Sequence, residues 1–336
     1  MDTPPPAAVD EPSLTALVTS AWGIELDTLV YVPKGAGSYH WLAQHHGETT
    51  HFITVDDLDT KPWIGRDRES TFEGLTGAYE TAWVLHDSGV DAVVAPLRDV
   101  HGAITARLSD QYSVALFPYV EGVAGNWGEP IDRSQHTQLL RELARLHSAT
   151  VARSAGIRRR PHVLPERDDL HAALADLDRP WRGGAYAEPA RHALVEHRSY
   201  VRELLTRFDA LAAHLDASGR ELVVTHGEPH PGNLIHVGAR VRVIDWDTVA
   251  LAEPERDLWM LDHSVDALDL YTELTATEID RAGIEFYGLA WTLSDIASFA
   301  AMFRTEHADT QWVESKWQGF VYLLEGGSST PYGNRP

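Results

Sequence analysis

The chain has 336 residues, of which 43% are hydrophobic and 23% charged. These proportions exclude a disordered, collagenous or coiled-coil protein, and the length suits one large domain or two packed lobes. The absence of cysteine excludes disulfides, a thiolate nucleophile and cysteine-based metal sites. The 50 acidic residues outnumber the 28 basic ones, and the formal charge of −22 disfavours nucleic acid and anionic membranes as partners.

The N-terminus reads MDTPPPAAVDEP, which is acidic and rich in proline. It lacks the basic start and the apolar core of a secretory signal, so we expect residues 1–12 to form a flexible tail. No apolar run approaches the roughly 18 to 20 residues that span a bilayer. We therefore expect a cytoplasmic monomer or homodimer with neither a membrane nor a nucleic acid as its partner.

Residues 13–117 have the pattern of a mainly β region. Ser13 is placed to cap a helix that ends before Gly23. The β-branched run at 28–32 predicts a strand, and 34–41 predicts a glycine-rich turn that leads into a second strand. This first part of the chain therefore begins with a helix followed by a hairpin.

A third strand is predicted at 51–55, where the sequence is HFITV. Ser70 and Glu73 are spaced as a capping box, and they open a helix with apolar residues at helical spacing that stops at Gly89. Two further stretches have the composition of strands, namely 92–96 and 112–117.

The segment FPYVEG at 117–122 contains proline and glycine, and beyond it the pattern becomes helical. We therefore place a lobe boundary after residue 117, which gives an N-lobe of residues 13–117 and a C-lobe of residues 118–336. Apolar stripes predict core helices at 137–147 and 201–215.

Two further features of the C-lobe follow from composition. Residues 153–189 are charged and rich in proline and glycine, which predicts a long insertion or a mobile segment. Thr275 and Glu278 form another apparent capping box, ahead of the two or three helices that finish the chain.

An irregular loop with the sequence THGEPHPGN interrupts the helical region at 225–233. Two prolines and two glycines within nine residues exclude a regular helix or strand. The loop lies between a short apolar strand at 222–224 and a hairpin at 234–244, which ends in Asp245-Trp246-Asp247. Such a density of ionisable and amide groups on a rigid loop indicates that they act together.

The residues allow three interpretations. For phosphoryl transfer, Glu228 would be the base, Asn233 and Asp245 would supply oxygen ligands for Mg²⁺, and the backbone of 35–38 would cover the phosphates. Order and spacing favour this interpretation over the other two.

In the second interpretation, His226, Glu228 and His230 bind the metal of a hydrolase, although the prolines argue against a cupin strand. In the third, the same groups only support the structure, with His226 packed, Glu228 capping a turn, and Asp245 and Asp247 on a solvated strand end.

The motif HGEPHPGN at 226–233 resembles the catalytic loop of the aminoglycoside phosphotransferase and choline kinase family, His-Gly-Asp-x-x-x-x-Asn. Asp245-Trp246-Asp247 is similar to its metal-binding motif, PERDL at 254–258 to the stretch that follows, and LARLH at 143–147 to the helix that precedes the loop. The resemblance implies a two-lobed α+β fold like that of protein kinases, with a small mainly β N-lobe and a larger helical C-lobe.

The resemblance also implies roles for single residues. Glu228 takes the position of the catalytic base, beside His226 and Asn233 of the same loop. Asn233, Asp245 and Asp247 would bind Mg²⁺, and Asp257 would brace the loop by accepting hydrogen bonds from backbone N–H groups.

ATP or GTP would bind between the lobes. The phosphates would lie under the turn formed by Lys34, Gly35, Ala36, Gly37 and Ser38. The base would contact the hinge at Pro118, Tyr119 and Val120. Residues just beyond Asp257 would form the pocket for the acceptor hydroxyl compound, with Trp259, Asp262 and Asp266 as candidates.

The sequence departs from the family pattern in two ways. Glu228 stands where the family has Asp, and its side chain is longer by about 1.5 Å; a misplacement of about 1 Å can cost about a hundredfold in rate. The third strand also lacks the family's lysine. Lys34 or Lys61 could replace it, and Glu80 would then be the acidic partner.

The predicted reaction is transfer of the γ-phosphoryl group to a small-molecule hydroxyl. An antibiotic, either of the aminoglycoside type or a nucleoside or peptide antibiotic, is the favoured acceptor, and its modification would give resistance or self-resistance. The alternatives are a kinase for a sugar, an amino sugar or a choline-like metabolite, and a catalytically silent kinase-like protein that binds a ligand.

Overall fold

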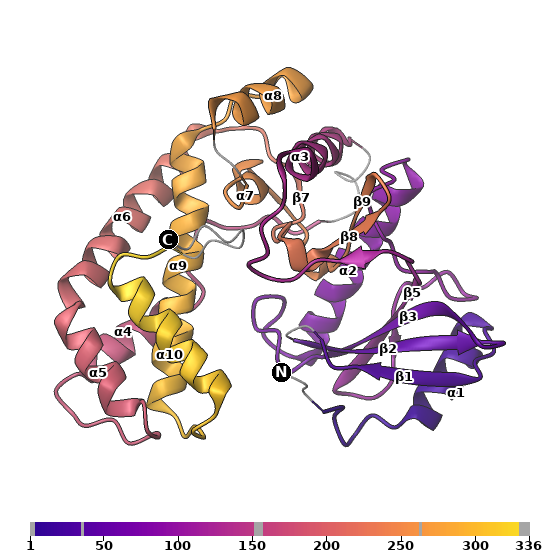
Figure 1. The fold of residues 1–336 in the computed structure, drawn as a ribbon, viewed down its shortest axis with the longest axis horizontal. Coiled ribbons are helices and arrows are strands. Elements are labelled where there is room, and N and C mark those ends of the chain that lie inside the picture. The colour runs from indigo at the N-terminus through magenta and orange to yellow at the C-terminus, as the bar shows by residue number, and fades with distance from the viewer. Residues whose placement is uncertain (1–3, 35–36, 151–156, 262–263, 329–336) are drawn as a thin grey trace.

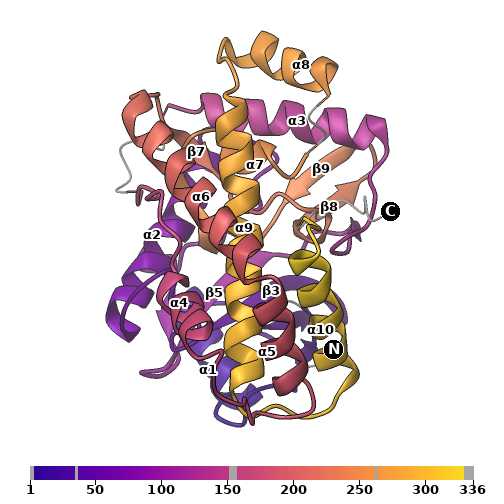
Figure 2. The same ribbon diagram turned by 90° about the vertical axis from the view of Figure 1, so that its left-hand side faces the viewer.

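The computed structural model describes residues 4–34, 37–150, 157–261 and 264–328. A mainly β region comes first and a helical region follows it, as the two perpendicular views show (Figures 1 and 2). The predicted α+β architecture is therefore confirmed. Within the described ranges, no helix combines the length and the apolar character needed to cross a membrane.

A five-stranded antiparallel sheet forms the first region. Its strands are β1 (Thr28–Val32), β2 (Ser38–His45), β3 (Glu48–Asp57), β4 (Ala106–Arg107) and β5 (Tyr112–Pro118), in the order β1-β2-β3-β5-β4. Strand β3 runs further than the predicted 51–55, and its last residues include Asp56, which lies opposite Ser38 of β2. The extension brings a carboxylate to the end of β2 that follows the glycine-rich turn.

Two helices accompany the sheet, α1 (Glu11–Trp22) and α2 (Arg68–Asp87). The predicted caps Ser13 and Ser70 are wrong, because each serine lies in the first turn and donates its N–H to an aspartate three residues earlier, Asp10 or Asp67. The capping box of α2 consists of Asp67 and Ser70, without Glu73. Helix α1 thus begins inside the predicted flexible tail.

The predicted strand at 92–96 is also wrong. Val93 forms one isolated parallel bridge with Val243, and the N–H of Val94 donates to the carbonyl of Val243 at 3.0 Å. The segment is apolar because it is buried in the core, where Val93 is 2% exposed. Burial alone explains the apolar composition of the segment, since it meets the hairpin at 234–244 only at this one bridge and does not pair along it.

Helices dominate after residue 118. They are α3 (Arg133–Ser148), α4 (Arg167–Ala175), α5 (Ala187–Glu196), α6 (Arg198–Ser218), α7 (Glu255–Leu258), α8 (Val265–Thr275), α9 (Arg281–Arg304) and α10 (Gln311–Leu324). Helix α9 is the longest, and α4, α5, α6, α7 and α10 pack against it. A second hydrophobic core lies among these helices, separate from the core beneath the sheet.

Two predictions for this region are wrong. The proposed insertion at 153–189 contains α4, whose Leu170 is fully buried, and the start of α5; residues 153–156 lie outside the described ranges. Thr275 is the last residue of α8, and Asp280 caps α9 by accepting the N–H of Ala282. Proline and glycine here mark turns between packed helices.

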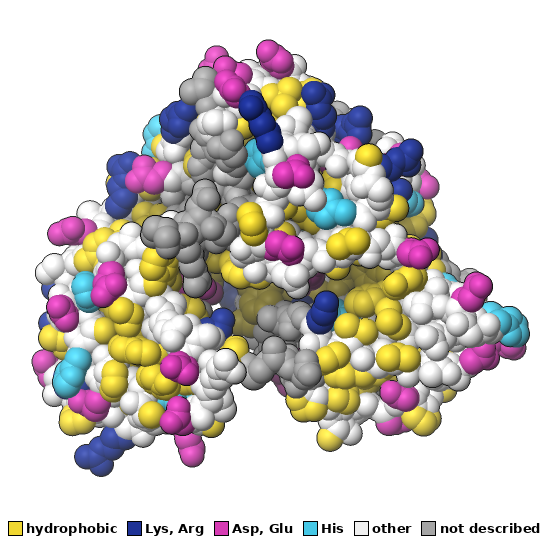
Figure 3. Space-filling view, viewed as in Figure 1, with side chains coloured by type: hydrophobic (Ala, Val, Ile, Leu, Met, Phe, Trp, Pro, Cys, Tyr) yellow, Lys and Arg dark blue, Asp and Glu magenta, His cyan; other side chains and the backbone are white. Residues whose placement is uncertain are grey.

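Short strands connect the two regions. Strand β7 (Val223–Thr225) pairs with β10 (Ala250–Ala252), and β6 (Val123–Ala124), β8 (Leu234–Val237) and β9 (Arg240–Val243) form a small sheet. The connection from β7 to β8 lies between the large sheet and the helices (Figure 1). The molecular surface is hollowed between the sheet at lower right and α9 and α10 at lower left (Figure 3).

Candidate active site

Asp257, on the single turn of α7, holds the loop that contains the HGE motif. Its carboxylate is fully buried and accepts hydrogen bonds from the backbone N–H groups of His226 at 2.9 Å and Gly227 at 2.5 Å. Bonds from an ionised acceptor to backbone donors are among the stronger hydrogen bonds in proteins. Asp257 therefore fixes the backbone at the start of this loop.

His147, near the end of α3, supports Asp257 from behind. Its Nε2 lies 2.9 Å from Oδ2 of Asp257, and its Nδ1 lies 2.7 Å from the hydroxyl of Tyr271. Burial opposes ionisation of Asp257, but His147 and Arg256 outweigh it and hold the pKa of this carboxyl below its usual value. Asp257 is therefore ionised, as an acceptor of two N–H groups should be.

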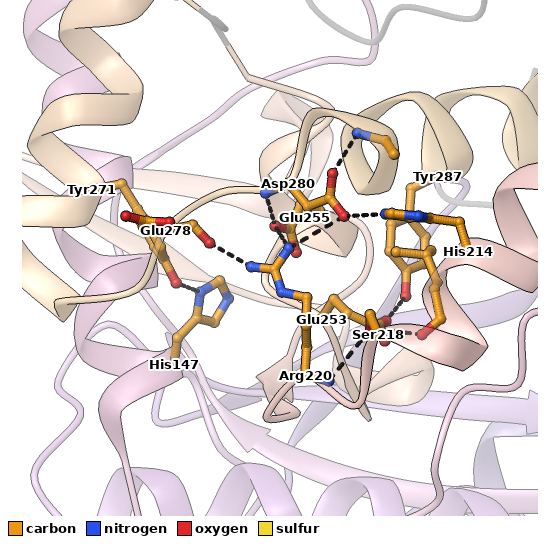
Figure 4. A network of polar contacts seen from close by, with 12 residues as sticks. His147, His214, Ser218, Arg220, Glu253, Glu255, Tyr271, Glu278, Asp280 and Tyr287 are labelled. Carbon is orange, nitrogen blue, oxygen red and sulfur yellow. Dashed lines mark hydrogen bonds and ion pairs between the residues drawn. The ribbon is translucent and has the colours of Figure 1, made fainter.

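The segment that carries Asp257 is anchored on its far side by a polar network (Figure 4). Arg220 forms an ion pair of 2.8 Å with the buried Glu255, which also accepts the N–H of Asp280 at 2.6 Å. His214 contacts the carboxylate of Asp280 at 2.8 Å. Helices α3, α6, α8 and α9 all contribute to fixing α7, and through it the loop.

Glycine is the residue type that fits at position 227, directly before Glu228. Its φ is +101°, and a Cβ placed on it would lie 2.2 Å from the guanidinium of Arg256. That guanidinium is itself held, since it donates to the hydroxyl of Thr225 at 2.7 Å and to the carbonyl of Thr248 at 2.8 Å. The loop cannot shift at this point without breaking these bonds.

Glu228 has the properties of a general base. Its side chain is 31% exposed, and Oε2 lies 3.8 Å from Nε2 of His230. Desolvation opposes ionisation, but the neighbouring His230 outweighs it and lowers the pKa of Glu228 below its usual value. The carboxylate is therefore ionised at neutral pH and can accept a proton.

His226 is engaged on both ring nitrogens. Nδ1 accepts the backbone N–H of Glu228 at 3.2 Å, so Nε2 carries the proton and donates to the carbonyl of Ile244 at 2.8 Å. Burial lowers its pKa, which keeps the ring neutral. These bonds give His226 a role in holding the loop, and they leave no ring nitrogen to bind a metal.

Asn233 and Asp245 can hold a hard cation. The Nδ2 of Asn233 donates to the carbonyl of Glu228 at 3.0 Å, which leaves Oδ1 as the ligand atom. The N–H of Ile244 donates to the carbonyl of Asn233, so Asp245 follows directly beside it. Asp245 is exposed and adopts the strained φ of +66°. Oxygen donors of this kind suit Mg²⁺.

The hydrolase interpretation finds no support in the described part of the chain. No three His, Asp or Glu side chains gather there as a metal site. Of its three proposed ligands, His226 is committed to backbone groups.

Lys61 is a buried cation beside Gly37 of the predicted phosphate-binding turn. It lies in the turn after β3, is 1% exposed, and contacts Asp247 at 2.7 Å and Asp56 at 3.1 Å. Burial lowers the pKa of a lysine, but the two carboxylates reverse this and raise the pKa of Lys61. Lys34 is exposed. Of the two candidates, Lys61 alone reaches the Asp245-Trp246-Asp247 segment.

The predicted partner Glu80 is wrong. It forms an ion pair of 2.6 Å with Arg98, whose guanidinium lies 4.0 Å above the ring of Trp83 on the same helix. The acidic partner is instead Asp56, which also accepts hydrogen bonds from Ser38 at 2.7 Å and Tyr79 at 3.0 Å. Asp56 is fully buried, and sequence reasoning missed it as a site residue.

The end of the glycine-rich turn, at Gly37, lies beside Lys61. Gly35 and Ala36 lie outside the described residues. Gly37 has a φ of +97°, and a Cβ placed on it would be 3.7 Å from Nζ of Lys61. Together with Ser38, whose hydroxyl bonds Asp56, it places backbone groups beside the lysine.

The hinge is an exposed stretch after the sheet. Pro118 ends β5, Tyr119 is 41% exposed, and Val120 is half-buried. The N–H of Tyr119 already donates to the carbonyl of Thr50 at 3.0 Å. A nucleotide base would therefore have to use other main-chain groups of this stretch.

The predicted acceptor residues are separated in space. Trp259 is 8% exposed, and its ring centroid lies 5.6 Å from that of Trp291. Asp266 is on α8, where it is exposed and contacts Arg133 of α3 at 3.3 Å. Asp262 lies outside the described residues.

The sequence model of the phosphotransferase enzyme family matches residues 46–292. The chain belongs to this family. It is an enzyme that transfers a phosphoryl group to a small molecule, as the resemblance of its motifs predicted. Protein StrN from Streptomyces griseus is similar, with 29% identity over 275 residues that cover 78% of this chain and 80% of StrN.

Solved structures share the fold. A spectinomycin phosphotransferase in complex with ADP and spectinomycin is 16% identical with a TM-score of 0.73, and the match covers 94% of this chain and 97% of that one. A choline kinase from Streptococcus pneumoniae is 14% identical with a TM-score of 0.54, covering 94% and 99%. The two-lobed kinase-like fold is thereby confirmed.

Proposed function

We propose that this enzyme transfers the γ-phosphoryl group of ATP or GTP to a hydroxyl group of an antibiotic, and so confers resistance or self-resistance. The observation that carries the proposal is the ionised Glu228 on a loop that Asp257 holds by two backbone N–H groups. A base in a fixed position is the main requirement of a reaction in which positioning and electrostatics supply most of the rate.

In the proposed reaction, Glu228 accepts a hydrogen bond from the acceptor hydroxyl and takes its proton. The hydroxyl oxygen forms a bond to the γ-phosphorus while the bond to the bridging β–γ oxygen breaks, and the nucleoside diphosphate leaves. His230, 3.8 Å from Glu228, keeps the carboxylate ionised before the proton arrives.

The phosphates would be held from both sides of the hollow. Lys61 would exchange a carboxylate partner for phosphate oxygens, and the backbone at Gly37 and Ser38 would cover them. Asn233 and Asp245 would hold Mg²⁺, which, when bound, neutralises charge on the β and γ oxygens. Asp247 would keep Lys61 oriented, and it is a second candidate ligand for the metal.

An antibiotic acceptor is favoured by similarity. Spectinomycin is bound in the phosphotransferase whose fold matches with a TM-score of 0.73. A second candidate is a kinase for a choline-like metabolite, which the similarity to a choline kinase of TM-score 0.54 favours. The third alternative is a catalytically silent ligand-binding protein. It is less well supported, because Glu228 as a base, oxygen ligands for a metal and the buried Lys61 are all present.

The test is mass spectrometry of a panel containing spectinomycin, kanamycin and choline after incubation with enzyme, Mg²⁺ and ATP or GTP. One compound should gain a phosphoryl group. Glu228→Gln should lower its turnover by about 10² to 10⁴, while nucleotide affinity stays within about twofold. The exposed Glu306→Gln is the matched control.

Three results would change the assignment. Unchanged turnover in Glu228→Gln would remove Glu228 from the role of base. Phosphorylation of choline alone would identify a metabolite kinase. Failure of the wild-type protein to bind either nucleotide would favour the silent binding protein.

A further inference from the structure

Three tryptophans and a histidine form a continuous aromatic row that begins beside Glu228. His230, 3.8 Å from the Glu228 carboxylate, meets the ring of Trp127 edge to face at 4.5 Å between centroids. Trp127 stacks on Trp291 at 5.8 Å and 18°, and Trp291 contacts Trp259 at 5.6 Å. The row thus joins the loop of the base to α9 and the end of α7.

Exposure decreases along the three tryptophans, whereas His230 at the start of the row is buried. Trp127 is 48% exposed, Trp291 is half-buried and Trp259 is 8% exposed. The buried end belongs to the helical core, whereas the open end lies one histidine away from the base. A large apolar surface at this place is what a ligand site uses to orient a molecule.

Trp127 lies on a turn that is fixed against the loop of the base. Its neighbour Asn126 donates its N–H to the carboxylate of Glu129 at 2.8 Å. A Cβ placed on Gly125 would lie 2.4 Å from the carbonyl oxygen of Pro231, so the two segments are in close contact. The backbone that carries Trp127 is therefore held close to the loop that contains Glu228.

Of the two aspartates predicted to bind the acceptor, the structure describes Asp266. It lies on α8 and contacts Arg133 of α3, a residue outside this row. On the side of Glu228 that faces His230, the next side chain along the row is the indole of Trp127. An indole ring recognises the apolar C–H face of a saturated ring, which leaves the hydroxyl groups at the ring edge free for other partners.

We propose that Trp127 and Trp291 form the wall of the acceptor site and select an alcohol built on a saturated ring. One C–H face of the ring packs against the indole of Trp127, and a hydroxyl at the ring edge reaches Glu228. The proposal rests on the phosphotransferase function above. It adds that ring shape, more than charge, determines which hydroxyl compounds are accepted.

The test compares Trp127→Ala and Trp127→Phe with Trp312→Ala, an equally exposed tryptophan on α10. The acceptors are spectinomycin, inositol and methyl glucoside as ring alcohols, and choline as an acyclic one. Trp127→Ala should raise KM for a ring alcohol about tenfold, Trp127→Phe less, and neither should change KM for the nucleotide. Trp312→Ala should match the wild type.

The outcomes separate this proposal from the function it rests on. A wild-type enzyme that phosphorylates choline but no ring alcohol overturns the proposal and leaves the phosphotransferase function standing. An unchanged KM for a ring alcohol in Trp127→Ala, with a normal KM for the nucleotide, also overturns the proposal and leaves the phosphotransferase function standing. Failure to phosphorylate any compound, together with failure to bind nucleotide, overturns both.

Discussion

At the scale of single residues, the main finding is the position of the buried lysine. The family places it on the third strand, whereas here Lys61 lies in the turn after β3, and Asp56 occupies the strand. Asp56 and Asp247 lie on either side of the Lys61 ammonium. We propose that a turn lysine with a strand aspartate takes the place of the family's strand lysine with a helix glutamate.

Lys61→Ala should raise KM for the nucleotide and destabilise the fold. Removing one member of a buried ion pair costs about 3 to 5 kcal/mol, because Asp56 and Asp247 are left without a cation. Urea unfolding and nucleotide kinetics measure the two effects, with the exposed Lys34→Ala as the control. If Lys61→Ala does not fold, the double variant Lys61→Met/Asp56→Asn removes one charge of each sign.

The double variant should fold and still show the raised nucleotide KM. A normal nucleotide KM in that variant would show that Lys61 supports the structure without binding phosphate. The same effect in Lys34→Ala would assign phosphate binding to the glycine-rich turn.

The sequence predicted the residues of the site that lie close together along the chain. Glu228 and Asn233 are five residues apart on one loop, so their spacing alone was informative. Lys61 and Asp247 are 186 residues apart, and no spacing rule connects them. Asp56 carried a weaker signal, since an aspartate inside a buried strand needs a cation. Trp127 carried none, because a tryptophan beside glycines is found in many turns.

At the scale of elements, apolar periodicity predicted the core helices α3 and α6, and the errors at the helix starts come from competing local interactions. The first turns of α1 and α2 each contain a serine that resembles a cap, but an aspartate three residues earlier is available to both. An ionised carboxylate is the better acceptor for the free N–H groups of a helix start. Which of the two residues caps the helix depends on the direction of the backbone at the helix start. The apolar periodicity of the sequence does not contain this information.

The buried His162 attaches the stretch before α4 to the rest of the helical region. His162 lies between Glu253, at 3.0 Å, and Asp216, at 2.8 Å, and Glu253 also accepts the hydroxyl of Tyr287 at 2.6 Å. The bond to Glu253 raises the pKa of His162. Burial opposes ionisation of Glu253, but His162 and Tyr287 outweigh it and lower its pKa to about 2. The contact joins the stretch before α4 to the segment after β10.

This pair should make stability depend on pH. His162 stabilises the fold below its unfolded pKa of about 6.5, and the effect is lost as pH rises through its higher folded pKa. Glu253 stabilises above about 4.5, and the effect is lost as pH falls towards 2. His162→Gln should therefore lower the free energy of unfolding by about 1 to 2 kcal/mol between about pH 4.5 and about pH 6.5. At alkaline pH the loss should be smaller.

Thermal unfolding of His162→Gln and wild type across pH measures this dependence. The exposed His171→Gln is the control and should follow the wild type. A difference in stability that stays constant from acidic to alkaline pH would mean that His162 acts through packing alone.

At the scale of the whole molecule, the buried ion pair of Lys61 with Asp247 links the two regions. Lys61 follows the large sheet, whereas Asp247 follows the small hairpin of the helical region. A nucleotide that binds there contacts both regions at once. Its binding should therefore stabilise the entire chain against unfolding.

Nucleotide with Mg²⁺ at a hundredfold excess over Kd should stabilise the protein by about 2.7 kcal/mol, which corresponds to about 4 °C in Tm for a chain of this length. Asp245→Asn should abolish the part of this shift that requires Mg²⁺. Differential scanning fluorimetry with and without Mg²⁺ measures it. A shift that persists in Asp245→Asn but disappears in Asp247→Asn would assign the metal to Asp247.

The clamped loop has a consequence for the chemistry of the product. Asp257 holds the two N–H groups before Glu228, and Arg256 fills the space beside Gly227, so the backbone cannot follow a change in the length of the base. The extra methylene of glutamate therefore places the carboxylate about 1.5 Å further from this fixed backbone than an aspartate would. On an acceptor with several hydroxyl groups, we expect this reach to determine the regiochemistry of phosphorylation, so that glutamate and aspartate at position 228 would modify different hydroxyl groups of the same ring.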